Sequence, residues 1–423
     1  MAETELGQID GLSSIDIHLR EYESSAPLDL SEDAERMLRT EINGGRERTG
    51  SRIEVAYDRD GLATLTATQY VGVVSLPDGP TIQIRPKAAG TNLLSLLRFA
   101  RDVDPTTFDR ETRMEAGDTF VEPLAILFER ELRTVIQQGL HREYHRIDGQ
   151  EDRLRGQLQV QRQLQRQGPT PTRFECRYSD LTYDTVANQG ILYATTLLQR
   201  LVTDQELQQR LHQHQAILRQ RVSLRRVDPN ELDRLSVSHL NRYYEDLLRL
   251  TELIVRGVFI DDLATGTRGT FALLVNMNTI FEAVVERALR DALAERAGWT
   301  VKGQYTTQQL VTGGNHTVTI RPDIVVLDPS DEVRFVGDAK WKLGAPSNSD
   351  FYQMSAYQLA HDCPGALIYP EQDGVVESNC LINGSHRLEL IELPTRSLAQ
   401  GFKEYTERLQ RSLEERVTGL IGE

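Results

Sequence analysis

The sequence predicts a multidomain α/β protein with a small mostly-β N-terminal domain (residues 1–110), a helical middle region (111–265) and a C-terminal α/β domain (266–423). Two observations lead to this prediction. The chain has 423 residues, which is more than a single hydrophobic core usually holds. Its hydrophobic pattern also changes along the chain, from alternating residues to apolar residues at three- and four-residue steps, and then to a mixture of both.

The composition is typical of a water-soluble globular protein, with 39% hydrophobic and 26% charged residues. No apolar run approaches the roughly 20 residues needed to cross a bilayer, so we expect no membrane association. The first residues show no basic stretch followed by an apolar one, and we expect a cytoplasmic location. Cys176, Cys363 and Cys380 are far apart and odd in number, so neither a disulfide framework nor a cysteine metal site is expected.

The net charge of -15 argues against a free-standing DNA-binding protein, because phosphate contacts require local positive charge. The basic residues are almost all Arg, and the chain has only five lysines. Two explanations remain open. An acidic, Lys-poor surface suits a high-salt cytoplasm, or another subunit supplies most of the contacts to DNA.

In the N-terminal domain, residues 32–42 have helical spacing. A small antiparallel sheet is expected across 52–86, because alternating runs there are separated by Asp/Gly turns. Asn92 is expected to cap the helix that follows it. Pro86 and Lys87 either end the last strand or mark a docking edge, and we favour the first interpretation.

The middle region is expected to form long amphipathic helices at 121–144, 181–201 and 239–259. His141 and His145 would then lie four residues apart on one helix; a metal pair is the alternative to a solvated face, but no third ligand is near. The arginines between 219 and 226 would contact DNA phosphate or form an Arg–Glu network. Three residues that step by four predict a polar helical stripe with a capping or packing role, or else a partner contact: Asp180, Asp184 and Asn188.

The C-terminal domain begins after a break in the helical pattern at 261–269. A helix, three strands, a helix, a strand and a final helix are expected in that order: 276–296, 300–312, 315–327, 333–341, 350–361, 365–370 and 397–416.

Two of these strands carry the residues that point to chemistry. Asp338 and Lys340 are two positions apart and therefore face the same side of a strand, and a hairpin would place Asp323 beside Asp338. Mg²⁺ prefers oxygen ligands, so Asp323, Asp338 and the carbonyl of Ala339 would hold it against a scissile phosphate and a water. Lys340 would orient that water and offset developing charge. The alternative, a surface salt-bridge cluster, is disfavoured because both acids lie in apolar runs.

These motifs resemble the PD-(D/E)-x-K nuclease superfamily, through R-P-D ending at Asp323 and D-A-K beginning at Asp338. Glu282 in the preceding helix matches an additional metal or water ligand of that superfamily. Gln353 and Tyr357 look like the Q-x-x-x-Y element of its RecB-like branch, in which both face the DNA and the site. The resemblance implies a restriction-endonuclease-like C-terminal domain, in which Gln353 and Tyr357 support the site. The catalytic and metal-binding residues that it implies are Glu282, Asp323, Asp338, Ala339 and Lys340. An ordinary exposed glutamate and simple helix packing remain the alternatives for Glu282 and for the Gln–Tyr pair.

Residues 71–87, 92–100, 153–158 and 174–192 are also similar to McrC-type subunits of 5-methylcytosine restriction systems, and the match covers most of the chain from about residue 50. The resemblance implies a Mg²⁺-dependent endonuclease subunit. It would dock on a ring of a McrB-like AAA+ GTPase, stimulate GTP hydrolysis and cut double-stranded DNA with modified cytosine. The sequence has no G-x-x-x-x-G-K-[ST], as this role requires. A nuclease-inactive regulatory subunit and a stand-alone RecB-like exonuclease are the alternatives.

Overall fold

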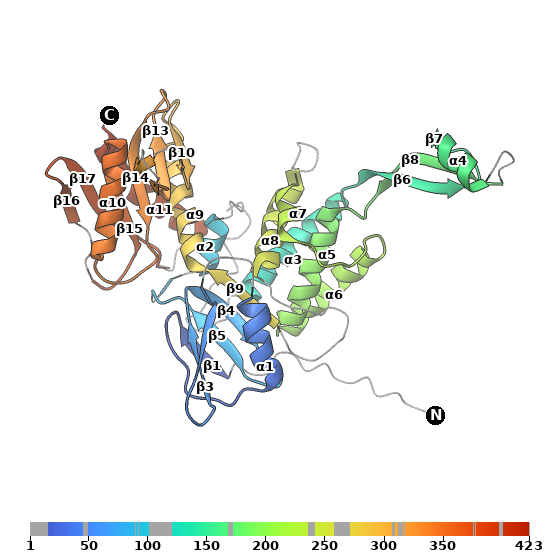
Figure 1. Cartoon of the computed structure of the whole chain (residues 1–423), viewed down its shortest axis with the longest axis horizontal. Coiled ribbons are helices and arrows are strands. Elements are labelled where there is room, and N and C mark those ends of the chain that lie inside the picture. The colour runs from blue at the N-terminus through green and yellow to red at the C-terminus, as the bar shows by residue number, and fades with distance from the viewer. Residues whose placement is uncertain are drawn as a thin grey trace. The chain divides into compact units, whose positions relative to one another are not determined.

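A computed structural model describes most of the chain and confirms the mixed α/β class (Figure 1). By its internal contacts the chain divides into two compact units, residues 1–124 together with 257–423, and residues 125–256. No helix in the described ranges is long and apolar enough to cross a membrane. Those ranges are 16–44, 50–88, 90–91, 93–100, 121–167, 172–235, 242–257, 271–306, 309–311, 316, 318–374, 376, 378–396 and 401–422.

The first unit contains a four-stranded sheet of order β1-β5-β4-β9. Its central strands, β4 (Tyr70–Ser75) and β5 (Thr81–Arg85), form the antiparallel hairpin that the sequence predicts. Strand β1 (Ile17–Arg20) adds to β5 in parallel, and β9 (Phe271–Asn276) adds to β4 in antiparallel. A strand that follows the middle region in the sequence therefore completes the N-terminal sheet.

The prediction of one sheet across 52–86 is wrong, because β2 (Ile53–Tyr57) and β3 (Ala63–Ala67) pair with each other in a separate two-stranded sheet. The helical spacing from Glu32 is confirmed by α1 (Glu32–Arg36), which continues into a π-helical turn, η1 (Met37–Ile42). The helix α2 (Leu93–Ala100) follows β5, while its expected cap, Asn92, lies outside the described residues.

The same unit holds a six-stranded sheet of order β10-β13-β14-β15-β17-β16. The pair β13–β14 is antiparallel, and β14, β15 and β17 run parallel. The hairpin β16–β17 is absent from the sequence prediction. The strands are β10 (Thr300–Gly303), β13 (Ile324–Leu327), β14 (Val333–Ala339), β15 (Gly365–Pro370), β16 (Ser378–Ile382) and β17 (His386–Leu393), with a small pair β11 (Gln309–Val311) and β12 (Val318–Thr319) beside them in the sequence.

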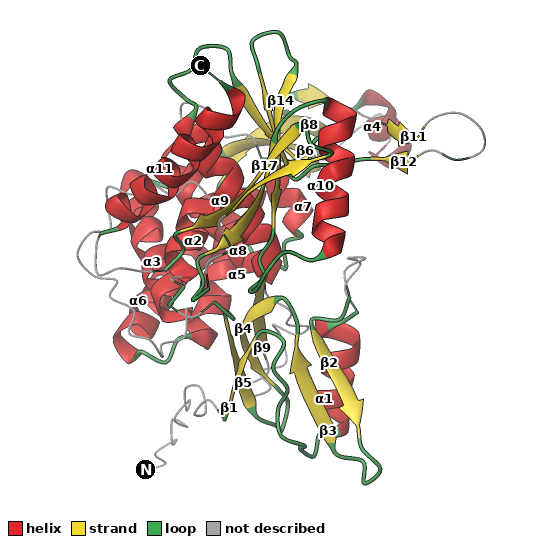
Figure 2. Ribbon diagram, turned by 90° about the vertical axis from the view of Figure 1, so that its left-hand side faces the viewer, coloured by secondary structure: helices red, strands yellow, loops and turns green. Residues whose placement is uncertain are grey.

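Three helices cover this sheet, as Figure 2 shows, with α10 (Asn348–His361) on one face and α9 (Met277–Ala292) and α11 (Phe402–Ile421) on the other. All three were expected, although α11 begins and ends later than predicted. Val336 of β14 and Met354 of α10 are both fully buried in one apolar cluster. This packing holds α10 against one face of β14. Asp338 lies on that same face, because it is two residues after Val336 in the strand.

The second unit consists of helices and a three-stranded sheet of order β6-β8-β7. The strands β6 and β8 form a long ribbon that extends from the helices, with α4 near its far end (Figure 1). The middle region is therefore not wholly helical. Its elements are α3 (Val121–Gln138), β6 (Glu143–Glu151), β7 (Gln157–Leu158), α4 (Val160–Gln167), β8 (Phe174–Thr182), α5 (Val186–Leu201), α6 (Gln205–Arg219), α7 (Pro229–Asp233), η3 (Arg242–Tyr244) and α8 (Glu245–Gly257).

The helical His141–His145 pair is a wrong prediction, because α3 ends at Gln138 and His145 lies in β6. Gly139 takes a φ of 102° immediately after the helix. Glycine adopts this left-handed conformation at little cost, and it commonly ends helices for that reason. The two histidines therefore share no helical face.

The predicted polar stripe is also wrong as a helical feature, because Asp180 lies in β8 and Asp184 precedes α5. The packing role holds for Asn188, which is fully buried. Its Nδ2 donates to the carbonyl oxygens of His141 (2.9 Å) and Tyr183 (2.7 Å). Its Oδ1 accepts a hydrogen bond of 2.9 Å from the Tyr244 hydroxyl.

Candidate active site

The hairpin β13–β14 brings the two predicted aspartates together. Ile324 pairs with Gly337, so the next pair of positions along the hairpin is Asp323 and Asp338. The backbone N–H of Ala339 donates to Oδ2 of Asp323 at 3.1 Å. Asp323 therefore lies beside the end of β14, as the sequence predicts.

Lys340 lies at the same end of the strand and faces Asp338. Its Nζ is 2.5 Å from Oδ2 of Asp338, whose side chain is fully buried. Neither carboxylate oxygen of Asp338 has a hydrogen-bond partner of acceptable geometry in the described part of the chain. A buried carboxylate without hydrogen bonds is expensive, so this position is suited to a cation.

The helix α10 supports Lys340 through the predicted Gln–Tyr pair. Nζ of Lys340 donates to Oε1 of Gln353 at 2.9 Å. Nε2 of Gln353 donates to the hydroxyl of Tyr357 at 2.8 Å, and that hydroxyl donates to the carbonyl oxygen of Arg321 at 3.1 Å. These hydrogen bonds link Lys340 through α10 to the backbone of Arg321, which lies two residues before Asp323. They therefore fix the direction of the lysine side chain.

Glu282 comes to the site from α9. Its Oε2 accepts a hydrogen bond of 3.1 Å from Nε2 of Gln304, a residue that the sequence did not single out. Gln304 is itself fixed because its backbone N–H donates to the carbonyl oxygen of Asp323 at 2.8 Å. Glu282 and Asp323 are therefore both held by Gln304, the first by its side chain and the second by its backbone N–H.

The carboxyl groups at this site repel one another. Burial, followed by the charges of Asp338 and Glu282, raises the pKa of Asp323 from 3.8 to about 8. Burial and the charge of Asp338 also raise the pKa of Glu282. Burial acts to lower the pKa of Lys340, but Asp338 and Asp323 raise it above its ordinary value, so the ammonium form is favoured. With all three carboxyl groups ionised, their negative charge would exceed the positive charge of Lys340.

A cavity of about 520 Å³ opens onto these residues. Glu282, Asp323, Ala339 and Lys340 line it. In the described ranges, no three His, Cys, Asp or Glu side chains already stand in the arrangement of a metal site. The two aspartates nevertheless suit a hard divalent cation, since both supply carboxylate oxygens, and those of Asp338 are buried and make no hydrogen bond.

Three residues that were not predicted to take part in this site also line the cavity: Tyr22, Lys87 and Lys342. Lys87 follows β5, where only the end of a strand or a docking edge was expected. A signal was present in the composition: the chain has five lysines, and Lys87, Lys340 and Lys342 line this one cavity.

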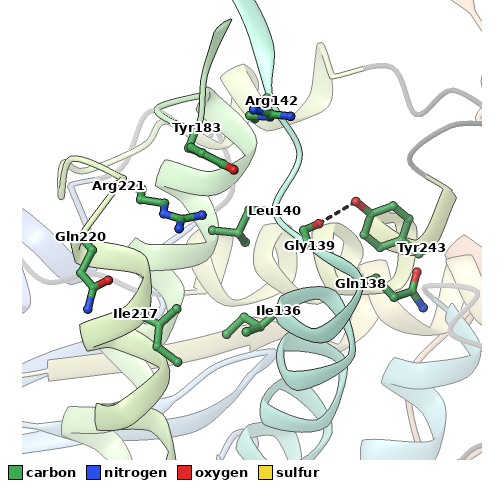
Figure 3. Close-up of a pocket in the computed structure, with 10 residues that line it drawn as sticks. All are labelled: Ile136, Gln138, Gly139, Leu140, Arg142, Tyr183, Ile217, Gln220, Arg221 and Tyr243. Atoms are coloured by element: carbon green, nitrogen blue, oxygen red, sulfur yellow. Dashed lines mark hydrogen bonds between the residues drawn. The ribbon is translucent and has the colours of Figure 1, made fainter.

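The other candidates lie in the second unit and do not form a comparable site. Arg225 bonds to Glu231 at 2.8 Å, in agreement with the predicted Arg–Glu network. Arg221 instead lies over the ring of Tyr183 in a separate pocket of about 400 Å³, with Arg142 on the same ring (Figure 3). None of the predicted catalytic residues lines this pocket.

The cysteines are free, as expected, and Cys176 and Cys363 are buried. Burial raises the pKa of Cys363 to about 12, so its thiol is unreactive at neutral pH.

Comparisons with known proteins connect this geometry to a family. The sequence model of the McrBC 5-methylcytosine restriction system component family matches residues 65–370. The chain belongs to this family. The matched range of the McrBC component includes β13, β14 and the whole of α10, and it contains every predicted catalytic residue. No curated protein sequence matches the chain.

A solved structure shows a similar fold for this McrBC component. One similar chain comes from a half-complex of a tetradecameric assembly of Thermococcus gammatolerans McrB AAA+ hexamers with bound McrC, with a TM-score of 0.58 and 17% identity over 95% of this chain and 99% of that chain. A second, from the cryo-EM structure of the Thermococcus gammatolerans McrBC complex, has 20% identity over 66% of this chain and 88% of that chain, but its TM-score of 0.42 is too low to support an argument.

Proposed function

We propose that this McrBC component is the Mg²⁺-dependent endonuclease subunit of a GTP-dependent restriction complex that recognises modified cytosine. The observation that carries the proposal is the position of Asp323 opposite Asp338 at the end of one hairpin. Lys340 forms an ion pair with Asp338 and donates a hydrogen bond to Gln353. We assign residues 266–423, apart from β9 in the N-terminal sheet, to a PD-(D/E)-x-K nuclease domain on this basis. DNA restriction takes place where the DNA is, so the proposal keeps the cytoplasmic location expected from the sequence.

In this proposal, Asp323, Asp338 and the backbone oxygen of Ala339 would hold Mg²⁺, with Glu282 adding negative charge from α9. Bound there, the ion would supply Lewis-acid polarisation of a phosphodiester and acidify a water. Lys340 would position that water and offset charge on the phosphate, because Gln353 holds its ammonium on the side of the acids. Asp323 would have to lose its proton before it could bind a cation, since its pKa is raised.

We further propose that the subunit works with an AAA+ GTPase ring. The support is the similar chain from an assembly of McrB AAA+ hexamers with bound McrC, which covers nearly the whole length of this chain. A separate subunit that contacts and recognises the DNA would also explain why a nuclease carries a net charge of -15. We expect the N-terminal part of the chain to contribute to docking on the ring.

The experiment compares Asp338→Ala and Lys340→Ala with wild type in the assembled complex. We expect both substitutions to abolish cutting of methylated duplex DNA while stimulation of the partner's GTP hydrolysis stays unchanged. Asp373→Ala and Lys403→Ala serve as matched controls, because both side chains are largely exposed and form only surface ion pairs.

Each outcome separates one function from another. Retained cutting by both site variants would overturn the site assignment. A wild-type chain that stimulates GTP hydrolysis without any cutting would be a regulatory subunit. A wild-type chain that degrades DNA without the partner would instead be a stand-alone nuclease.

A further inference from the structure

The nuclease cavity contains a lysine that does not come from the nuclease fold. Lys87 follows β5 in the N-terminal sheet, yet it lines the same cavity as Asp323, Glu282 and Lys340. The N-terminal sheet and the strand that carries Asp338 belong to one compact unit, so the position of Lys87 beside the acids is part of the fold of that unit.

A buried glutamate fixes Lys87 relative to the catalytic strand. Oε2 of Glu21 accepts a hydrogen bond from the backbone N–H of Lys87 at 2.9 Å and another from Nε1 of Trp341 at 2.8 Å. Trp341 directly follows Lys340 in the sequence, and its ring packs against Phe281 with the centroids 5.4 Å apart. Glu21 therefore joins the backbone at Lys87 to the end of β14.

The ammonium group of Lys87 has spare hydrogen-bonding capacity. Its side chain is only 13% exposed, and its Nζ lies 3.8 Å from Oε1 of Glu21 and 4.6 Å from the centre of the Tyr22 ring. A distance of 3.8 Å is too long for a hydrogen bond. Within the described ranges Nζ makes none, although an ammonium carries three donors.

The other two lysines of the cavity are already paired with aspartates. Lys340 lies 2.5 Å from Asp338, and Lys342 bonds to Asp350. Burial lowers the pKa of Lys87, and charge repulsion from Lys342 lowers it further, against the opposing attraction of Glu21. An anion in the cavity would satisfy the free donors of Lys87 and relieve this repulsion.

We propose that Lys87 binds a backbone phosphate of the DNA substrate beside the scissile one, so that the N-terminal sheet supplies a substrate-binding residue to the nuclease cavity. This inference rests on the proposed nuclease function. Lysine suits the role because it binds phosphate as a point charge. A cavity of about 520 Å³ leaves space for the sugar–phosphate backbone next to the acids.

The test measures the affinity of the assembled complex for duplex DNA as a function of salt, in an Asp338→Ala background that is expected not to cut. In that background, Lys87→Met should weaken binding about tenfold. It should also make the plot of log K for binding against the logarithm of the salt concentration less steep, by about 0.9, which is the value of one lost phosphate contact. Lys87→Arg should keep the slope, and so should Lys403→Met, a control on α11 whose side chain is 78% exposed.

An unchanged slope and affinity in Lys87→Met would overturn the proposal and leave Lys87 as a structural partner of Glu21. If Lys87→Met fails to fold, the substrate can be changed instead, with single neutral methylphosphonates placed around the cut. One position beside the scissile phosphate should then weaken binding of the unaltered Lys87 protein about tenfold. The absence of any such position would also overturn the proposal.

Cutting by the wild-type complex is scored separately, so that the two proposals can fail independently. Cutting by wild type with no effect of Lys87→Met on binding refutes the phosphate contact alone. A reduced slope in Lys87→Met, together with no cutting by wild type, refutes the nuclease proposal and leaves a DNA-binding role for Lys87.

Discussion

Replacing Asp323 with Asn should stabilise the metal-free protein while it abolishes cutting. The pKa of Asp323 is raised to about 8 from an ordinary value of 3.8, by burial first and then by Asp338 and Glu282. A raised pKa in the folded state means that this group's contribution to stability is complete below pH 3.8 and is lost as the pH rises through about 8. At pH 7 the carboxyl group of Asp323 is therefore protonated in the folded protein, whereas in the unfolded chain it would be ionised.

The magnitude follows from the shift. Each pKa unit corresponds to about 1.4 kcal/mol, so protonation at pH 7 of a carboxyl that titrates at 3.8 when unfolded costs at most about 4 kcal/mol. The amide introduced by Asp323→Asn would carry no charge, and its oxygen would still accept the hydrogen bond that the backbone N–H of Ala339 donates to Asp323. We therefore expect the variant to gain up to about this amount at pH 7.

The assay is urea unfolding in EDTA at a series of pH values, followed by tryptophan fluorescence. Both tryptophans, Trp299 and Trp341, belong to the unit that contains the site. The stability difference between Asp323→Asn and wild type should grow by about 1.4 kcal/mol per pH unit from about pH 5 to 7.5. Asp373→Asn, with a side chain that is 88% exposed, is the control and should stay within about 0.5 kcal/mol of wild type. The proposed burial and repulsion of Asp323 would be refuted if the variant were no more stable than wild type at pH 7, or if the difference in stability did not depend on pH.

Three further predictions concern other parts of the chain. Gln353→Ala should lower the rate of cutting about tenfold with little loss of stability, because Lys340 loses the acceptor that orients it; steady-state cutting and a thermal melt would show this. Asn188→Ala should lower the free energy of unfolding by about 2–4 kcal/mol in a denaturant titration, because it leaves several buried groups unpaired. Gly72→Ala should cost at least about 3 kcal/mol in the same measurement, since φ is 150° and the added Cβ would lie 1.9 Å from the carbonyl oxygen of Leu273.

The part of the site that was predicted from the sequence depends on local features. Alternation in a strand places Asp338 and Lys340 on one face, and the turn at 329–331 joins the two strands that pair. Helical spacing likewise places Gln353 and Tyr357 together on α10. These relations hold whatever the rest of the chain does, and this is why the hairpin and the Gln–Tyr contact were expected before the structure was known.

The features that were not predicted depend on contacts between distant segments. Pairing of β4 with β9 joins residues on either side of the middle region, and no periodicity in either strand specifies its partner. The same is true of Glu21 and Trp341, whose hydrogen bond places Lys87 in the cavity. Two local errors had available signals: Gly139 marks the end of α3, and the alternation in residues 386–393 marks β17.

The most direct measurement for the central claim is anomalous diffraction from crystals of the chain soaked in Mn²⁺, a divalent ion that shares the oxygen preference of Mg²⁺. We predict a peak between the carboxylates of Asp323 and Asp338, next to the backbone oxygen of Ala339, and its loss in Asp338→Ala. No peak at Mn²⁺ concentrations that support cutting, or a peak away from both aspartates in a protein that still cuts, would contradict the assignment of these residues as the metal-binding core.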